Sequence, residues 1–81
     1  MGDEDQKYIE WQLNQARAKI RDARKQKRIS LRSLSAMSEV DTETIHDFET
    51  GKTIIRIDKL LLLCRALEIN IADLFNDADI K

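Results

Sequence analysis

The stretch ISLRSLSAMSEVDTETIHDFETG, residues 29–51, predicts two short helices separated by a turn. Ser30 is a good N-cap for the first helix, because its hydroxyl oxygen can accept a hydrogen bond from a free amide of the first turn. The helix should end near residues 38–39, since a new helix-start signal follows Val40. We expect three apolar residues, spaced three apart, to form its inward face: Leu31, Leu34 and Met37.

The second helix of this pair begins at Asp41 or Thr42, where a side chain is again available for capping. Ile45 and Phe48 lie three apart and form its expected inward face. Gly51 ends the helix, because glycine adopts the left-handed conformation without a steric cost. Two short helices joined by a four-residue turn have the geometry of a helix-turn-helix.

Helices are also expected on both sides of this pair. Apolar residues at positions 9, 13, 16, 20 and 23 are separated by steps of four and three, which predicts one helix from about residue 5 to residue 27. Residues 57–67 are apolar on more than one face and predict a central fourth helix. Asn70 is expected to cap a short fifth helix that folds back on the core.

The composition favours an all-α fold class. The 81 residues include no proline and two glycines, so the chain has few of the residues that many tight turns require. We expect an N-terminal extension over residues 1–19 that continues into the first helix. A compact five-helix domain should follow over residues 20–75, and a frayed tail over residues 76–81.

Cysteine usage and hydropathy indicate the compartment. Cys64 is the single cysteine, which excludes an internal disulfide framework and fits a reducing environment. We expect it to be a small core residue. No stretch approaches the ~20 apolar residues of a membrane span, and the first residues are acidic, unlike a signal peptide. A cytoplasmic protein without a membrane partner is therefore expected.

The net charge of −1 conceals an uneven distribution of charge along the chain. Residues 17–32 carry eight basic side chains against Asp22 alone, whereas residues 33–49 carry five acids and no base. A phosphate backbone responds to the local potential rather than to the net charge. The basic segment is therefore either a solvated helix face or part of a nucleic-acid surface.

A spaced pattern of residues runs through all five expected helices. It consists of Ile20-Arg21-x-x-Arg24, Ile29-Ser30-x-x-x-Leu34-Ser35, Val40-x-x-x-x-Ile45, Phe48-Glu49-x-Gly51 and Leu60-x-x-x-Cys64-x-Ala66-Leu67-x-Ile69-x-Ile71-x-x-Leu74-Phe75. Over residues 20–75 this pattern resembles the lambda-repressor/Cro-like helix-turn-helix family, the xenobiotic-response-element type of transcriptional regulator. The resemblance implies a compact domain that binds double-stranded DNA without a cofactor.

The resemblance also implies roles for individual residues. Arg24 and Glu49 fall where family members often place an internal ion pair. The implied base-reading positions, which face the major groove, are Thr42, Glu43, His46 and Asp47. The implied phosphate-contacting positions are Ser30, Arg32, Lys52, Thr53 and Arg56, with Arg28 as a further candidate.

The sequence departs from the family pattern at several positions. Glu39 stands where the turn commonly has glycine, Ile55 stands where proline is frequent, and Leu31 replaces a residue that is often polar. The second helix of the pair contains no Arg, Lys, Asn or Gln, which are the usual readers of guanine and adenine. Weaker reading remains available, since Glu43 can accept from a cytosine amino group and His46 can donate to guanine.

The N-terminal extension carries a second candidate surface. Ile9, Leu13 and Ala16 form an apolar stripe, and Tyr8 and Trp11 lie off that stripe. An exposed apolar patch of this kind usually packs against something. Either a second copy of the chain pairs with it about a two-fold axis, or the extension folds back on its own domain. Both alternatives remain open from the sequence.

Two functions follow as hypotheses. The first is a sequence-specific DNA-binding regulator, a repressor that binds as a homodimer through the second helix of the pair. The alternative is a protein-interaction module whose acidic helix has lost DNA reading. An enzyme is not expected, because the lone His46 has neither a second His nor paired Cys for a metal site and belongs to no nucleophile–base set.

Overall fold

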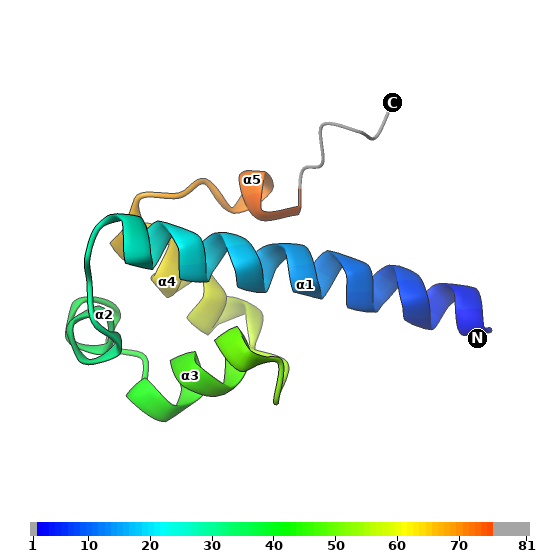
Figure 1. Ribbon diagram of the computed structural model, residues 1–81, viewed down its shortest axis with the longest axis horizontal. Helices are drawn as coiled ribbons and strands as arrows, with labels where there is room; N and C mark the ends of the chain where they lie inside the picture. The colour runs from blue at the N-terminus through cyan, green and yellow to red at the C-terminus, as the bar shows by residue number, and fades with distance from the viewer. Residues whose placement is uncertain (1, 76–81) are drawn as a thin grey trace.

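The computed structural model describes residues 2–75 and contains five helices, which confirms the all-α fold class. They are α1 (Asp3–Gln26), α2 (Leu31–Ser38), α3 (Thr42–Thr50), α4 (Ile57–Leu67) and α5 (Ile71–Phe75). α1 packs against α3, α4 and α5, and α2 packs against α3 and α4 (Figure 1). The expected frayed tail over residues 76–81 lies outside the described residues.

α1 is a single helix of 24 residues, roughly 36 Å long at 1.5 Å per residue. Its first turn is acidic and its last turn is basic, the arrangement that the helix dipole favours. The C-terminal half packs on the domain through Ala16 and Ile20, which are fully buried. The N-terminal turns project past the other helices, as Figure 1 shows. The first helix is therefore extended toward the N-terminus.

Side-chain hydrogen bonds define both ends of α2. Ser30 Oγ accepts from a backbone amide of the first turn at 3.0 Å, which confirms the expected N-cap. At the other end the buried Ser38 hydroxyl donates to the Leu34 carbonyl at 2.7 Å and accepts from the Val40 amide at 3.2 Å. Glu39 closes the helix with a φ of 65°, in the left-handed region. A side chain with a Cβ atom adopts this conformation at a cost of about 1–2 kcal/mol, so the turn is strained at Glu39.

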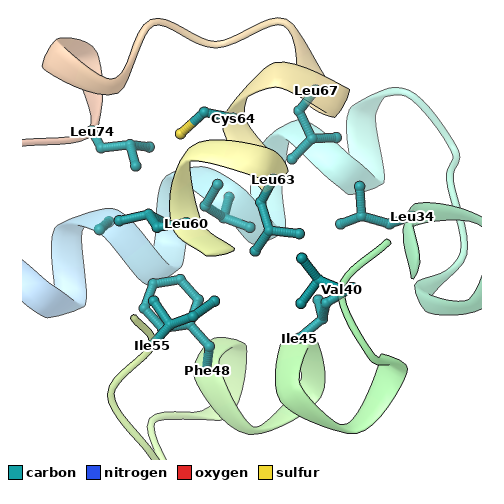
Figure 2. Close-up of a cluster of buried hydrophobic side chains, with 12 residues drawn as sticks. Leu34, Val40, Ile45, Phe48, Ile55, Leu60, Leu63, Cys64, Leu67 and Leu74 are labelled. Atoms are coloured by element: carbon teal, nitrogen blue, oxygen red, sulfur yellow. The ribbon is translucent and has the colours of Figure 1, made fainter. Parts of the chain in front are cut away.

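One hydrophobic core joins all five helices. In Figure 2, Leu63 lies in the middle of the labelled side chains, with Leu34 and Val40 to one side and Leu60 to the other. Ile55 comes from the connection between α3 and α4 and lies on the same side of the cluster as Phe48. The core consists of Ala16, Ile20, Leu34, Val40, Ile45, Phe48, Ile55, Leu60, Leu63, Cys64, Leu67 and Leu74.

The expected inward position of Met37 is wrong, because 52% of this residue is exposed. Residues three apart in a helix are rotated by about 300°, so a three-residue spacing drifts about 60° per step away from one face. Leu34 is buried and Leu31 is half-buried, whereas the second step carries Met37 to the surface. Ser38 takes the inward position of the last turn instead.

α4 is less enclosed than its apolar sequence predicts. One face is buried and supplies Leu60, Leu63, Cys64 and Leu67 to the core. The other apolar residues of the helix remain on the surface, with Ile57 60%, Leu61 44% and Leu62 38% exposed. A domain of this size has too few elements to cover a second apolar face. The fourth helix supplies four of the twelve core residues, as expected of a central helix, but its second apolar face is left uncovered.

Replacing Glu39 by glycine should stabilise the domain. Glycine relieves the left-handed strain but gains freedom in the unfolded chain, so we expect a net gain of about 0.5–1 kcal/mol. The matched control is Glu43→Gly, which places glycine inside α3 and should lower stability by about 1 kcal/mol. Urea unfolding followed by circular dichroism measures both, and a loss of stability in Glu39→Gly would contradict the strain at this turn.

Candidate nucleic-acid interface

A buried ion pair joins α1 to α3. Arg24 Nε lies 2.8 Å from Glu49 Oε2, and Arg24 Nη2 lies 2.8 Å from Glu49 Oε1, so the guanidinium holds both carboxylate oxygens. The remaining nitrogen, Nη1, donates to the Ile29 carbonyl at 3.0 Å, immediately before α2. The Arg24 and Glu49 side chains are 11% and 5% exposed. The hydrogen bonds to Glu49 raise the pKa of Arg24 against the opposing effect of burial, so Arg24 stays charged.

The outer face of α3 presents most of the implied base-reading residues. Ile45, Phe48 and Glu49 are buried, so the opposite side of the helix is directed to solvent. Thr42, Glu43 and His46 are exposed there, and His46 follows the other two by four and three residues, the spacing of one helix face. The side chain of Asp47 is only 19% exposed, and its carboxylate lies 3.6 Å from His46 Nδ1. Asp47 is therefore less accessible than the other three.

All six implied phosphate-contacting residues are exposed. Ser30 and Arg32 lie at the start of α2, Arg28 lies in the preceding connection, and the other three lie between α3 and α4. Arg28, Arg32 and Lys52 form no ion pair within residues 2–75. Arg56 Nη2, by contrast, lies 3.2 Å from Asp58 Oδ2. The two ends of the helix-turn-helix thus carry cations that are available to an anion.

The basic segment over residues 17–32 divides into internal and surface groups. Arg17 and Arg24 hold carbonyl or carboxylate groups of other elements, and Lys19 Nζ donates to the Asp73 carbonyl at 2.7 Å. The side chains of Arg21 and Lys27 are each 42% exposed, and each lies 3.8 Å from an acid. Part of the basic segment therefore holds the domain together, and only the rest is on the surface.

The apolar stripe of the N-terminal extension is buried at one end and exposed at the other. Ala16 is fully buried in the core of its own domain, so its assignment as a dimer residue is wrong. Tyr8, Ile9 and Trp11 are 62%, 41% and 39% exposed, because α1 projects past the domain at these positions. Leu13 is half-buried between these two regions. A groove of about 280 Å³ runs there, lined by Gln6, Ile9, Glu10, Leu13, Asn14, Arg17, Gly51 and Ile54.

Two features of the surface were not predicted from the sequence. A second groove, of about 370 Å³, lies between α2 and α4 and is lined in part by Met37, Leu62 and Arg65. Arg17 contacts two backbone carbonyls more than thirty residues away. Backbone carbonyls are present at every residue and have no side-chain signature, so no pattern in the sequence could have indicated the Arg17 contacts.

The one cysteine of the chain lies in the core and not on the surface. Cys64 is buried in the core as expected, and burial raises the pKa of its thiol, which disfavours the reactive thiolate. No group of three His, Cys, Asp or Glu side chains in this part of the chain is placed to hold a metal ion. No helix in the described part of the chain has the length and hydropathy to cross a membrane.

A family model described as the Cro/C1-type HTH DNA-binding domain matches residues 19–79. The matched region starts inside α1 and includes α2, α3, α4 and α5. Most of the projecting part of α1 precedes the match. Comparison of the chain with curated proteins and with solved structures gave no match.

Removing one partner of the buried ion pair should destabilise the domain strongly. Glu49→Gln leaves the Arg24 charge buried without its partner, and we expect a loss of about 3 kcal/mol. The double variant Arg24→Met/Glu49→Leu should recover most of that loss, because an apolar pair leaves no charge unpaired. The control is Asp22→Asn at an exposed pair, with an expected change below about 0.5 kcal/mol. Equal losses at Asp22 and Glu49 in urea unfolding would contradict this difference.

Proposed function

The chain belongs to the Cro/C1-type family of helix-turn-helix DNA-binding domains, and we propose that it is a sequence-specific transcriptional repressor that binds DNA as a homodimer. α3 lies in the major groove in this proposal, and the start of α2 and the α3–α4 connection lie against the phosphate backbone. The observation that carries the proposal is the exposed polar face of α3, flanked by cations that have no acidic partner among residues 2–75. Repression follows when such a dimer occupies a promoter and excludes the polymerase.

Phosphate contacts supply most of the affinity in this proposal. α3 has no Arg or Lys, and its first turn carries Glu43, so α3 itself repels a phosphate backbone. Arg28, Arg32 and Lys52 have no acidic partner within the described residues and can neutralise phosphates on both sides of α3. Such binding releases counterions and therefore weakens steeply as salt is added.

Sequence reading rests on three exposed side chains of α3. Thr42 can bond to either kind of base edge, Glu43 can accept from the cytosine amino group, and His46 can donate to guanine. An acidic side chain near the base edges repels neighbouring phosphates. Glu43 therefore weakens binding unless a cytosine amino group donates a hydrogen bond to it. We therefore propose that Glu43 contributes more to discrimination between sequences than to affinity.

A homodimer compensates for this weak reading. Two α3 helices held about one DNA turn apart read two half-sites at once, which multiplies the discrimination of a single helix. Ile9 and Leu13 form the stripe proposed for the contact, and Tyr8 and Trp11, which lie off that stripe, add exposed aromatic surface beside it. A two-fold axis places the same surface of both copies together.

A protein-interaction module is the second candidate. The acidic residues of α3 favour it, because Glu43 and Asp47 would oppose DNA and would attract a basic protein surface. The two candidates differ in which surface is used and in the response to salt. A module of this kind would ignore duplex DNA even at low ionic strength.

The affinity for DNA should depend steeply on salt. For a dimer that makes roughly six to ten phosphate contacts, we expect the affinity to fall by about three orders of magnitude or more between about 50 and 200 mM salt. Fluorescence anisotropy with a duplex selected from a random pool measures this dependence. Lys52→Ala should reduce the magnitude of the slope of log K against log salt by about one for each phosphate that is no longer neutralised.

The matched control for Lys52→Ala is Lys7→Ala, which removes the same charge from the projecting end of α1. Lys7→Ala should leave the slope unchanged, because Lys7 lies on α1, which supplies none of the proposed phosphate contacts. A wild-type affinity that does not change with salt would exclude phosphate-driven binding. Equal effects of the two variants would exclude the proposed location of the contact.

The oligomeric state should depend on the apolar surface of α1. We expect the combined Ile9→Asp and Leu13→Asp variant to be monomeric, because buried unpaired carboxylates would oppose association. The control is Met37→Asp, which places one such carboxylate on an exposed apolar residue of α2 and should leave the dimer intact. Light scattering gives the mass. An unchanged dimer in the α1 variant, or a monomer in the control, would place the contact elsewhere.

A further inference from the structure

Arg17 makes an unusual set of contacts with a distant part of the chain. Its Nε donates to the Phe48 carbonyl at 2.9 Å, and its Nη2 donates to the Thr53 carbonyl at 3.3 Å. Its Nη1 donates to Asn14 Oδ1 at 3.0 Å, which orients the guanidinium from within α1. The carbon at the centre of the guanidinium lies 5.6 Å from the centroid of the Phe48 ring. One side chain of α1 therefore holds both the end of α3 and the connection that follows it.

The α3–α4 connection has few other restraints. Gly51 adopts a left-handed φ of 85° and turns the chain out of α3. The amides of Lys52 and Thr53 donate to the Asp47 carbonyl at 2.8 and 3.3 Å, and beyond them only Ile55 enters the core. Ile54 is 70% exposed. A segment with so few buried contacts opens easily unless another element holds it.

We propose that Arg17 is a positioning residue for DNA binding, which holds the α3–α4 connection in the shape that presents Lys52, Thr53 and Arg56 to phosphates. This inference rests on the proposed function. The charge of Arg17 also neutralises the carbonyls at the end of α3, where the helix dipole is negative. A connection that is ordered before DNA arrives loses less conformational entropy on binding, so the complex is tighter.

The position of Arg17 gives the N-terminal extension a role. The family match begins at residue 19, so Arg17 lies before it, in the helix that the extension prolongs. A helix that started at residue 19 would have no side chain at this position. The proposal therefore makes the preceding turn of α1 part of the DNA-binding unit rather than an independent arm.

Two variants of the full chain separate positioning from charge. Arg17→Lys keeps the charge but cannot reach three acceptors with a planar fork, and Arg17→Gln removes the charge as well. The control is Arg21→Gln, one turn further along α1, where the side chain is 42% exposed and lies 3.8 Å from Asp22. The readouts are hydrogen exchange of the Lys52 and Thr53 amides without DNA and anisotropy with the selected duplex. Circular dichroism at the measurement temperature establishes that each variant is folded.

We expect both Arg17 variants to exchange faster at the Lys52 and Thr53 amides and to bind DNA about tenfold more weakly, the equivalent of one charge-assisted hydrogen bond. Arg21→Gln should leave these exchange rates unchanged. Wild-type binding or wild-type exchange in Arg17→Lys would overturn the inference. If the wild-type chain binds no duplex, both the proposed function and the inference about Arg17 fail. If the wild type and the Arg17 variants bind DNA alike, only the inference about Arg17 fails.

Discussion

The contact between Arg24 and Glu49 is the constraint on which the arrangement of the domain depends. One guanidinium holds both carboxylate oxygens of α3 and the carbonyl that precedes α2, so three elements meet at a single side chain of α1. The pair is nearly enclosed, and a buried charge without its partner is costly, so alternative packings of α3 on α1 that separate the pair are strongly disfavoured. Together with the burial of Ile45 and Phe48, this contact directs the outer face of α3 to solvent.

A second arginine of α1 also contacts the helix-turn-helix. Arg24 fixes the start of the helix-turn-helix, whereas Arg17, two turns earlier, contacts its end at Phe48 and Thr53. The basic residues of α1 thus divide between those that order the DNA-binding unit and those left on the surface. This division explains how a chain with a net charge of −1 can carry a DNA-binding domain, because a few well-placed cations matter more to a phosphate than the total.

The fold could be predicted from the sequence wherever a capping residue or an apolar spacing is compatible with only one local structure. Ser30, Gly51 and the spacing of apolar residues by three and four positions predicted the helix boundaries to within a few residues. Met37 and Leu61 show where this reasoning stops, because an apolar residue on a helix is buried only if another element covers it. The division of the N-terminal stripe at Leu13 has the same cause, since the domain ends before α1 does. The contacts of Arg17 depend on backbone atoms and had no signal in the sequence.

The proposed function requires that the exposed face of α3 and the two basic segments beside it form one DNA-binding surface. Amide chemical shifts of the isotope-labelled chain, titrated with the selected duplex, are the decisive measurement. We expect shifts to change at residues 28–32, 42–47 and 51–56 and to saturate together at one protein-to-DNA ratio. Changes confined to the projecting turns of α1 or to the groove between α2 and α4, or no change at all at low salt, would contradict a single surface of this kind.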